Sequence, residues 1–212
     1  MKTKNGLLAI FLLLNVATAL NAQNVRFGIT GGVNINKANF QNSKSTIGYQ
    51  VGGKVEVNLS PLSNGLYTDI GLLLSSKSFK NMEYFLPDAT GDLRMKGDLH
   101  YLTLPVQIGY KVKCNDKIST FISAGPYIGS GLWGKGELTL DGQKIDSSYK
   151  LFSDHLFKTF DWGMGAKIGL EYKKKYQLSI GYDLGLKDIQ GENSFHSYKN
   201  RSLNISISYL LN

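Results

Sequence analysis

The chain has 212 residues, a formal net charge of +8 and a hydrophobic fraction of 42%. The length fits one domain, and the single cysteine, Cys114, excludes an internal disulfide. Three histidines and one cysteine, scattered along the chain, have no spacing that suggests a zinc site. The basic residues form no continuous stripe, which argues against a nucleic-acid-binding protein.

The beginning of the chain has the pattern of a secretory signal peptide. Lys2 and Lys4 precede an apolar run over residues 7–14, and small residues follow up to Ala22. The alternative is a retained membrane anchor, but the run is shorter than the ~20 apolar residues that a spanning helix needs. We expect cleavage near Ala22, which gives a signal peptide at 1–22 and one domain at 23–212.

Apolar residues then alternate with polar residues and glycine, a period of two that predicts β-strands. The first three predicted strands cover residues 25–34, 47–58 and 66–76. Two more are predicted at 100–112 and 118–130. Because proline removes a donor from the strand ladder, we expect a bulge or a gap near Pro105 and Pro126.

Residues 160–187 give the most regular alternation. Two long strands, 160–172 and 176–187, are joined by Lys173, Lys174 and Lys175, and a last strand is predicted at 202–211. An ordinary globular strand has ~5 to 6 residues, whereas a membrane-spanning strand needs ~9 to 11. The strand lengths therefore indicate that lipid is the solvent on the apolar face.

The connections between the predicted strands alternate between long and short. The long ones are 35–46, 77–98, 131–158 and 188–199, and the short ones are 59–65, 113–117 and 173–175. This arrangement predicts an all-β fold, an eight-stranded antiparallel up-and-down transmembrane β-barrel with short periplasmic turns and long extracellular loops.

Aromatic residues gather toward the strand ends, as expected where rings sit at the two membrane interfaces. The predicted girdle at the tight turns consists of Tyr67, Tyr110, Tyr172, Tyr176 and Tyr209. The predicted girdle at the long loops consists of Phe79, Tyr101, Trp133, Phe160, Trp162 and Tyr198.

The charges on the glycine-rich faces of the strands are balanced. They are Arg26, Lys54, Lys111, Lys167 and Lys187 against Glu56, Asp69, Asp161, Glu171 and Asp183. Since eight strands enclose an interior that side chains just fill, we expect a salt-bridged plug and no open aqueous pore. The tight turns carry Lys113, Lys117, Lys173, Lys174 and Lys175 against Asp116, which suits anionic lipid headgroups.

Two motifs have a chemical interpretation that the sequence disfavours. Gly129, Gly131 and Gly134 match a dinucleotide fingerprint, but no helix follows to hold a pyrophosphate. His100, His155 and His196 fall toward the long loops, near Ser153, Asp154, Ser194 and Ser197, as a lipid-active rim enzyme would require. We interpret these as ordinary surface residues, and we expect no catalytic, cofactor-binding or metal-binding residues.

Inert packing is the preferred interpretation of Cys114, ahead of a free surface thiol or an intermolecular bridge.

The chain resembles the PorT-like outer-membrane β-barrel domain family of Bacteroidota. The resemblance covers the whole mature chain and rests on Tyr101 to Pro105, Ala124 to Tyr127, Asp161 to Gly163 with Gly165, Tyr182 to Leu186 with Ile189, and Asn200-Arg201. It implies the barrel fold, and it links the chain to a family in which PorT serves protein secretion. One departure is the ending Leu210-Leu211-Asn212, where such families usually have a final aromatic residue.

The leading hypothesis is a non-enzymatic outer-membrane barrel whose loops, chiefly 77–98 and 131–158, form a binding surface. The expected partners are outer-membrane lipids, including lipopolysaccharide, and envelope or secretion proteins; we expect a monomer without cofactors. The first alternative is the lipid-active rim enzyme, an acyl hydrolase or transferase. The second is a secreted soluble barrel that holds a small apolar ligand, which would require the apolar faces to point inward.

Overall fold

The computed structural model describes residues 25–37, 44–59, 65–83, 93–140, 143–153, 156–190 and 198–211, so the expected signal peptide lies outside it. The strands are β1 Val25–Asn36, β2 Thr46–Asn58, β3 Leu66–Glu83, β4 Leu93–Lys113, β5 Ile118–Leu140, β6 Gln143–Lys150, β7 Phe160–Tyr172, β8 Tyr176–Gly185 and β9 Arg201–Leu210. No helix in these residues is long and apolar enough to cross a membrane.

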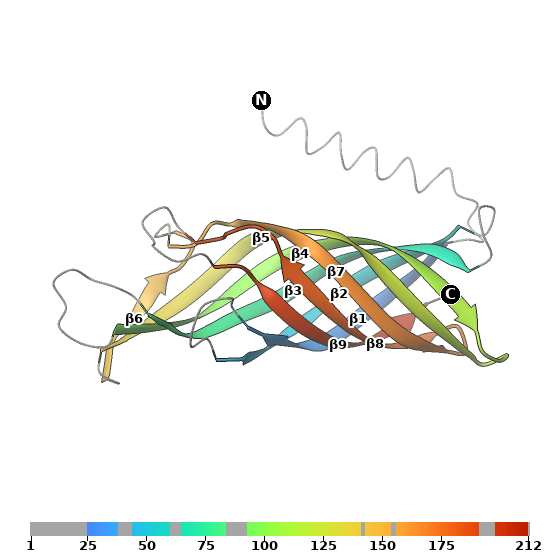
Figure 1. The fold of residues 1–212 in the computed structure, drawn as a ribbon, viewed down its shortest axis with the longest axis horizontal. Coiled ribbons are helices and arrows are strands. Elements are labelled where there is room, and N and C mark those ends of the chain that lie inside the picture. The colour runs from blue at the N-terminus through green and yellow to red at the C-terminus, as the bar shows by residue number, and fades with distance from the viewer. Residues whose placement is uncertain are drawn as a thin grey trace, which may run out of the picture.

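Eight of the strands form a closed antiparallel barrel (Figure 1). The order β4-β3-β2-β1-β9-β8-β7-β5 is closed by pairing of β4 with β5, and β1 pairs with β9, the last strand. The predicted fold class is therefore confirmed. One strand, β6, was not predicted and lies outside the closed barrel. It pairs with the last part of β5, from Lys135 to Leu140, beyond the residues of β5 that pair with β7.

The apolar faces of the strands point outward. Ile29, Ile47, Ile108, Ile168 and Ile207 are among the most exposed large side chains, each with more than half of its surface accessible. Serine, asparagine and charged side chains of the alternate positions are buried inside, as in the β9 pattern from Ser202 to Ser208. This orientation is the reverse of what a soluble barrel with an apolar interior requires, so that alternative is wrong.

The two longest predicted loops are largely strand. Strand β3 continues to Glu83 and β4 begins at Leu93, so most of the predicted loop 77–98 is a continuation of the β3–β4 hairpin. Residues 131–158 likewise contain the end of β5 and all of β6. We call residues 79–83, 93–99, 131–140 and β6 the outer extension; it lies at the left of Figure 1, opposite the tight turns.

The ladder is interrupted at Pro105, as its missing donor predicts. Pairing of β4 with β5 stops after Pro105 and Tyr127 and resumes in the same register at Ile108 and Ala124. The gap includes Pro126. The register shift in this pair of strands lies elsewhere, between His100 and Tyr101.

Only part of each predicted aromatic girdle faces the membrane. At the tight turns, Tyr110, Tyr172 and Tyr176 are exposed, but Tyr67 is 2% exposed and faces Phe121 inside the barrel. At the other end, Trp133, Phe160 and Trp162 are exposed. Phe79, Tyr101 and Tyr198 are buried there. The prediction was wrong for these four rings because a position near a strand end does not say which face the ring occupies.

Candidate functional site

The interior nearest the tight turns holds a closed cluster of two cations and two carboxylates. Arg26 contacts both Glu56 and Glu171, the latter at 2.9 Å. Lys111 contacts the same two carboxylates at 2.7 and 2.6 Å. The amide of Gln177 donates to both as well. Each carboxylate therefore has two cationic partners from other strands, which ties β1, β2, β4 and β7 together across the lumen.

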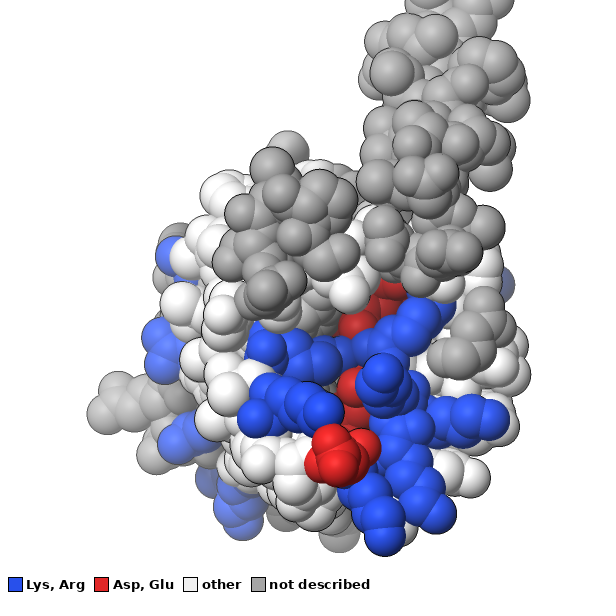
Figure 2. All heavy atoms as spheres, turned by 90° about the vertical axis from the view of Figure 1, so that its right-hand side faces the viewer, with Lys and Arg blue, Asp and Glu red and all other residues white. Residues whose placement is uncertain are grey.

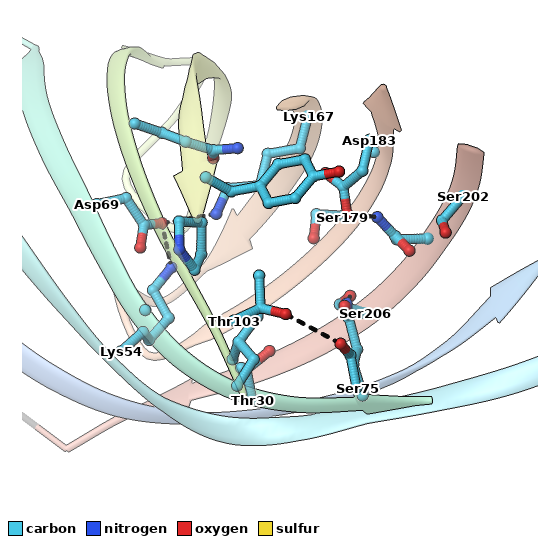
Figure 3. A pocket seen from close by; sticks show the side chains of 18 of the residues that line it. Thr30, Lys54, Asp69, Ser75, Thr103, Lys167, Ser179, Asp183, Ser202 and Ser206 are labelled. Carbon is cyan, nitrogen blue, oxygen red and sulfur yellow. Dashed lines mark hydrogen bonds and ion pairs between the residues drawn. The ribbon is translucent and has the colours of Figure 1, made fainter. Parts of the chain in front are cut away.

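A second cluster occupies the middle of the barrel (Figure 3). The Asp69 carboxylate accepts from Lys54 at 2.6 Å and from Lys167 at 2.8 Å. Lys54 also donates to Gln177, which connects this cluster to the first. Asn204 donates to Asp183 at 2.7 Å on the opposite wall. The space left between these side chains is about 80 Å³, room for only a few water molecules.

A third cluster surrounds Asp161, which is fully buried. Its Oδ2 atom accepts from Lys77 at 3.2 Å and from the Asn200 amide at 2.8 Å. The ammonium of Lys77 also lies over the rings of Tyr127 and Tyr101, 4.8 and 5.5 Å from their centroids. A cation at this distance from an aromatic face is stabilised by the ring quadrupole.

The interior charge is balanced as predicted, but one member differs. The five cations are Arg26, Lys54, Lys77, Lys111 and Lys167, and the five anions are Glu56, Asp69, Asp161, Glu171 and Asp183. The assignment of Lys187 to this set was wrong, because its ammonium lies over the ring of the outward-facing Phe160. Lys77 was missed because it was placed in a loop. Its inward parity with Asp69, Gly71 and Ser75 would have identified it.

Above the Asp161 cluster an apolar cap fills the mouth of the barrel opposite the tight turns. It consists of Phe79, Met95, Leu99, Tyr101, Leu151, Phe157, Ile189 and Tyr198, all almost fully buried. The Phe157 ring lies 5.1 Å from Phe79 and 5.3 Å from Tyr198, with edge-on geometry to the tyrosine. Leu151 and Phe157 both come after β6 in the chain, and the Phe157 amide donates to the Leu151 carbonyl at 2.9 Å.

The outer extension is charged on its exposed side. Glu137 on β5 bridges Lys96 on β4, at 2.7 Å, and Lys144 on β6, at 3.1 Å. Hydrogen bonds from Lys96 and then Lys144 lower the pKa of the Glu137 carboxyl. Glu137 is therefore ionised at neutral pH. Because the three side chains are 32% to 53% exposed, the bridge adds little to the backbone pairing that holds β6 to β5.

Of the three histidines, the structure describes His100, which has no serine beside it. The His100 ring stacks on Trp133 at 4.8 Å and shares a 3.4 Å hydrogen bond with the Tyr49 hydroxyl, and neither neighbour is a serine. His155 and His196 lie outside the described residues, as do Asp154, Ser194 and Ser197. Within the described part of the chain, His, Cys, Asp and Glu form no group of three that could hold a metal ion.

The other sequence motifs have structural roles. Gly129, Gly131 and Gly134 all lie on β5, with strand on both sides, so the dinucleotide interpretation has no helix to support it. Cys114 is exposed in the β4–β5 turn. Inert packing, the preferred interpretation of this thiol, is therefore wrong, and its free-thiol alternative fits the exposed position.

Comparison with known proteins gives a family match. Residues 21–191 match the family described as outer membrane protein beta-barrel domain. The match carries no PorT-like or Bacteroidota assignment. No curated protein sequence matches the chain significantly.

Several solved structures are similar at low identity. The attachment invasion locus protein Ail of Yersinia pestis has a TM-score of 0.44 and 12% identity, over 89% of this chain and 99% of that one. Neisserial surface protein A has a TM-score of 0.40 and 14% identity, over 86% and 96% of the two chains. The outer membrane protein OprG of Pseudomonas aeruginosa has a TM-score of 0.41 and 11% identity, over 88% and 94%.

Proposed function

Because the chain belongs to the outer membrane protein beta-barrel domain family, we propose that it is a non-enzymatic, non-conducting protein that presents its outer extension as a binding surface. The protein lies in the outer membrane of the cell, with its tight turns toward the periplasm and its outer extension outside the cell. The observation that carries the proposal is the four-stranded extension itself.

The extension has the features of a docking platform. Strand β3 continues past the last described bridge on its β2 side, which joins Lys44 to Lys80. Strand β5 likewise continues past Ser130, where its pairing with β7 ends, and β4 lies between β3 and β5. In the described residues β6 pairs with β5 alone, so one edge of β6 is open. An unpaired strand edge offers backbone donors and acceptors to an added strand of a partner.

The packing already described supports a closed lumen. The three ionic clusters cross the interior at successive depths, and the apolar cap lies at its outer mouth. Ions crossing such an interior would have to displace buried, paired charges, which is unfavourable. We therefore expect planar bilayers that contain the purified protein to show no steady single-channel conductance. Stable open steps at neutral pH would contradict the closed lumen.

A photo-crosslinking pair tests the binding surface in intact cells. A photoreactive residue replaces Ile145 on β6, which is 58% exposed, or Ile108 on the lipid-facing side of β4, which is 62% exposed. The extension predicts a discrete protein adduct at position 145 and none at 108. Equal adducts at both positions, or none at 145, would refute a partner at the β6 edge. The resemblance to PorT-like domains favours an envelope or secretion protein as that partner.

Two further parts of the proposal have direct tests. A non-enzymatic protein leaves the lipid A and phospholipid profiles of the cell unchanged when its gene is removed, and a changed acyl pattern would favour the rim enzyme. The proposed monomer makes its bilayer contacts with outer-membrane lipids, including lipopolysaccharide. Native mass spectrometry from detergent is expected to show one chain with bound lipid, and a stable dimer would contradict this.

A further inference from the structure

A hollow opens at the tight-turn end of the barrel, on the side that faces the periplasm. It has a volume of about 570 Å³ and lies among the starts of β1 and β3, the β4–β5 turn and the β7–β8 turn. Figure 2 shows this end directly: lysine and arginine side chains crowd around the mouth, with one acidic side chain at the front and other carboxylate atoms recessed between the cations. The volume falls in the range of about 300 to 1,000 Å³ that is typical of ligand sites.

The floor of the hollow is electrically neutral. It is formed by the cluster in which Arg26 and Lys111 each contact Glu56 and Glu171. The two positive and two negative charges cancel, and their hydrogen-bonding groups are engaged with one another. The floor therefore supplies rigidity, and the charge that a ligand would meet comes from the walls and rim.

The walls and rim are strongly basic. The two turns contribute Lys113, Lys117, Lys173, Lys174 and Lys175 against Asp116, five positive charges and one negative, a net charge of +4. Lys113 pairs with Asp116 at 2.8 Å, but both side chains are largely exposed and such a pair is weak. Lys113, Lys117 and Lys174 line the hollow itself.

The backbone holds the lysines of the β7–β8 turn in place. Lys173 and Lys174 have left-handed φ values of 50° and 59°, a conformation that costs a residue with a side chain roughly 1 to 2 kcal/mol. Tyr172 pairs with Tyr176, so the connection has three residues, and positions with φ above zero in hairpin turns are usually Asn or Gly. The amide of Lys173 donates to the Lys117 carbonyl at 2.6 Å, and the Lys174 carbonyl accepts from Arg26 at 2.9 Å. Strain that neighbouring contacts maintain is typical of functional positions.

The shape of the site distinguishes between anionic ligands. Lipid headgroups contact the outer surface of the barrel wall, where Tyr172 and Tyr176 are exposed, whereas the hollow opens at the end of the barrel, along its axis. Its cations belong to two separate turns, which suits several spaced carboxylates better than a single phosphate. Lysine ammonium groups act as point charges and suit such a ligand without a fixed fork geometry.

We propose that this hollow docks an acidic segment of a periplasmic protein, one that presents several carboxylates to Lys113, Lys117 and Lys174. The inference concerns the opposite end of the barrel from the proposed extension surface. It therefore does not depend on that surface, and each can fail alone. The ordered turns reduce the entropy lost on binding.

The test uses the purified protein in nanodiscs of zwitterionic phosphatidylcholine. A fluorescent Glu-rich peptide is titrated against the protein, with the Gln-rich peptide of the same length as its counterpart. We expect saturable binding of the Glu peptide that weakens as salt is added. Substitution of Lys113→Gln, Lys117→Gln and Lys174→Gln together is expected to weaken it about tenfold, since three modest charge interactions are lost.

The matched control removes three exposed lysines from the other end, Lys135→Gln, Lys144→Gln and Lys158→Gln, and is expected to leave the affinity unchanged. Equal binding of the Gln peptide, or an equal loss in the control, would overturn the proposal. Two other results would also overturn it. In the first, the triple variant binds the Glu peptide normally and loses only its preference for anionic phosphatidylglycerol vesicles, which would indicate a lipid site. In the second, the protein binds purified peptidoglycan and does not bind the peptide. A heat-dependent gel shift, the difference in gel mobility between heated and unheated samples in detergent, verifies that each variant is folded.

Discussion

The ammonium nitrogen of Lys77 lies 3.2 Å from the Oδ2 atom of Asp161, and the two side chains are 5% and 0% exposed. Lys77 comes from β3 and Asp161 from the start of β7, so the pair spans the lumen between strands that are not neighbours in the sheet. It lies directly beneath the apolar cap. The pair therefore lies between the polar interior and the apolar cap, where Lys77 contacts the ring of Tyr101.

Replacement of Lys77 by methionine should destabilise the barrel strongly. The substitution leaves the Asp161 carboxylate buried without its cation, a change that costs about 3 to 5 kcal/mol in the free energy of unfolding. Urea unfolding of the protein in lipid vesicles, followed by the heat-dependent gel shift, measures the loss. Lys77→Met combined with Asp161→Asn should recover part of it, because the two effects are coupled.

The control for this prediction is Lys80→Met on the same strand. Lys80 is exposed, and a surface substitution usually changes stability by less than about 0.5 kcal/mol. If Lys77→Met had an effect as small as Lys80→Met, the Lys77–Asp161 pair would have no structural importance.

Removal of the Phe157 ring should loosen the segment that closes the outer mouth. Phe157 is 3% exposed within the apolar cap, and Phe→Ala at a buried site typically costs about 3 to 5 kcal/mol. The loss should appear locally as faster tryptic cleavage after Lys158, which is exposed, while the barrel remains resistant. Phe160→Ala is the matched control, since that ring is 46% exposed on the outer face. Unchanged cleavage in Phe157→Ala would show that the cap does not hold this segment.

The sequence predicts the barrel well because one physical constraint acts on every membrane strand. Lipid on one side and a polar lumen on the other impose a period of two, which is legible in β7 and β8 without further information. The same constraint ends at the membrane surface. The outer extension is built by pairing of consecutive strands, β3 with β4, β4 with β5 and β5 with β6, outside the region where lipid imposes the alternation, and β6 lacks the long alternation that marks a spanning strand.

The sequence predicts the charge balance of the barrel interior better than it predicts which residues face inward. Balance between five cations and five anions follows from the cost of an unpaired buried charge, and the structure keeps that balance with Lys77 in place of Lys187. The inward direction of Tyr67 agrees with the strand parity that it shares with Asp69, and its place near a turn gives no information on the face. That ring fits because Gly109, on the next strand, leaves space beneath it.

The two tryptophans of the chain should report the outer membrane interface. Trp133 and Trp162 are 47% and 43% exposed on the outward face, near the ends of the strands toward the extension. In vesicles, Trp133→Phe and Trp162→Phe leave one reporter each. We expect blue-shifted emission from both, and stronger quenching by lipids brominated near the headgroup than near the chain ends. Unquenched emission typical of water would show that this face does not contact lipid.

Substitution of Gly109 by alanine should disturb the aromatic packing inside the barrel. A Cβ atom at Gly109 would lie 2.5 and 2.6 Å from ring atoms of Tyr67 and 2.7 Å from the Ile122 carbonyl oxygen, so the ring or the strand must move. Overpacking of this kind typically costs about 1 to 3 kcal/mol in the free energy of unfolding. Gly53→Ala on the outward face is the matched control, because its Cβ would meet only the Gly28 carbonyl oxygen at 3.9 Å. Tyr67→Leu added to Gly109→Ala should restore part of the loss. A larger effect in Gly53→Ala than in Gly109→Ala would show that Tyr67 does not occupy the lumen.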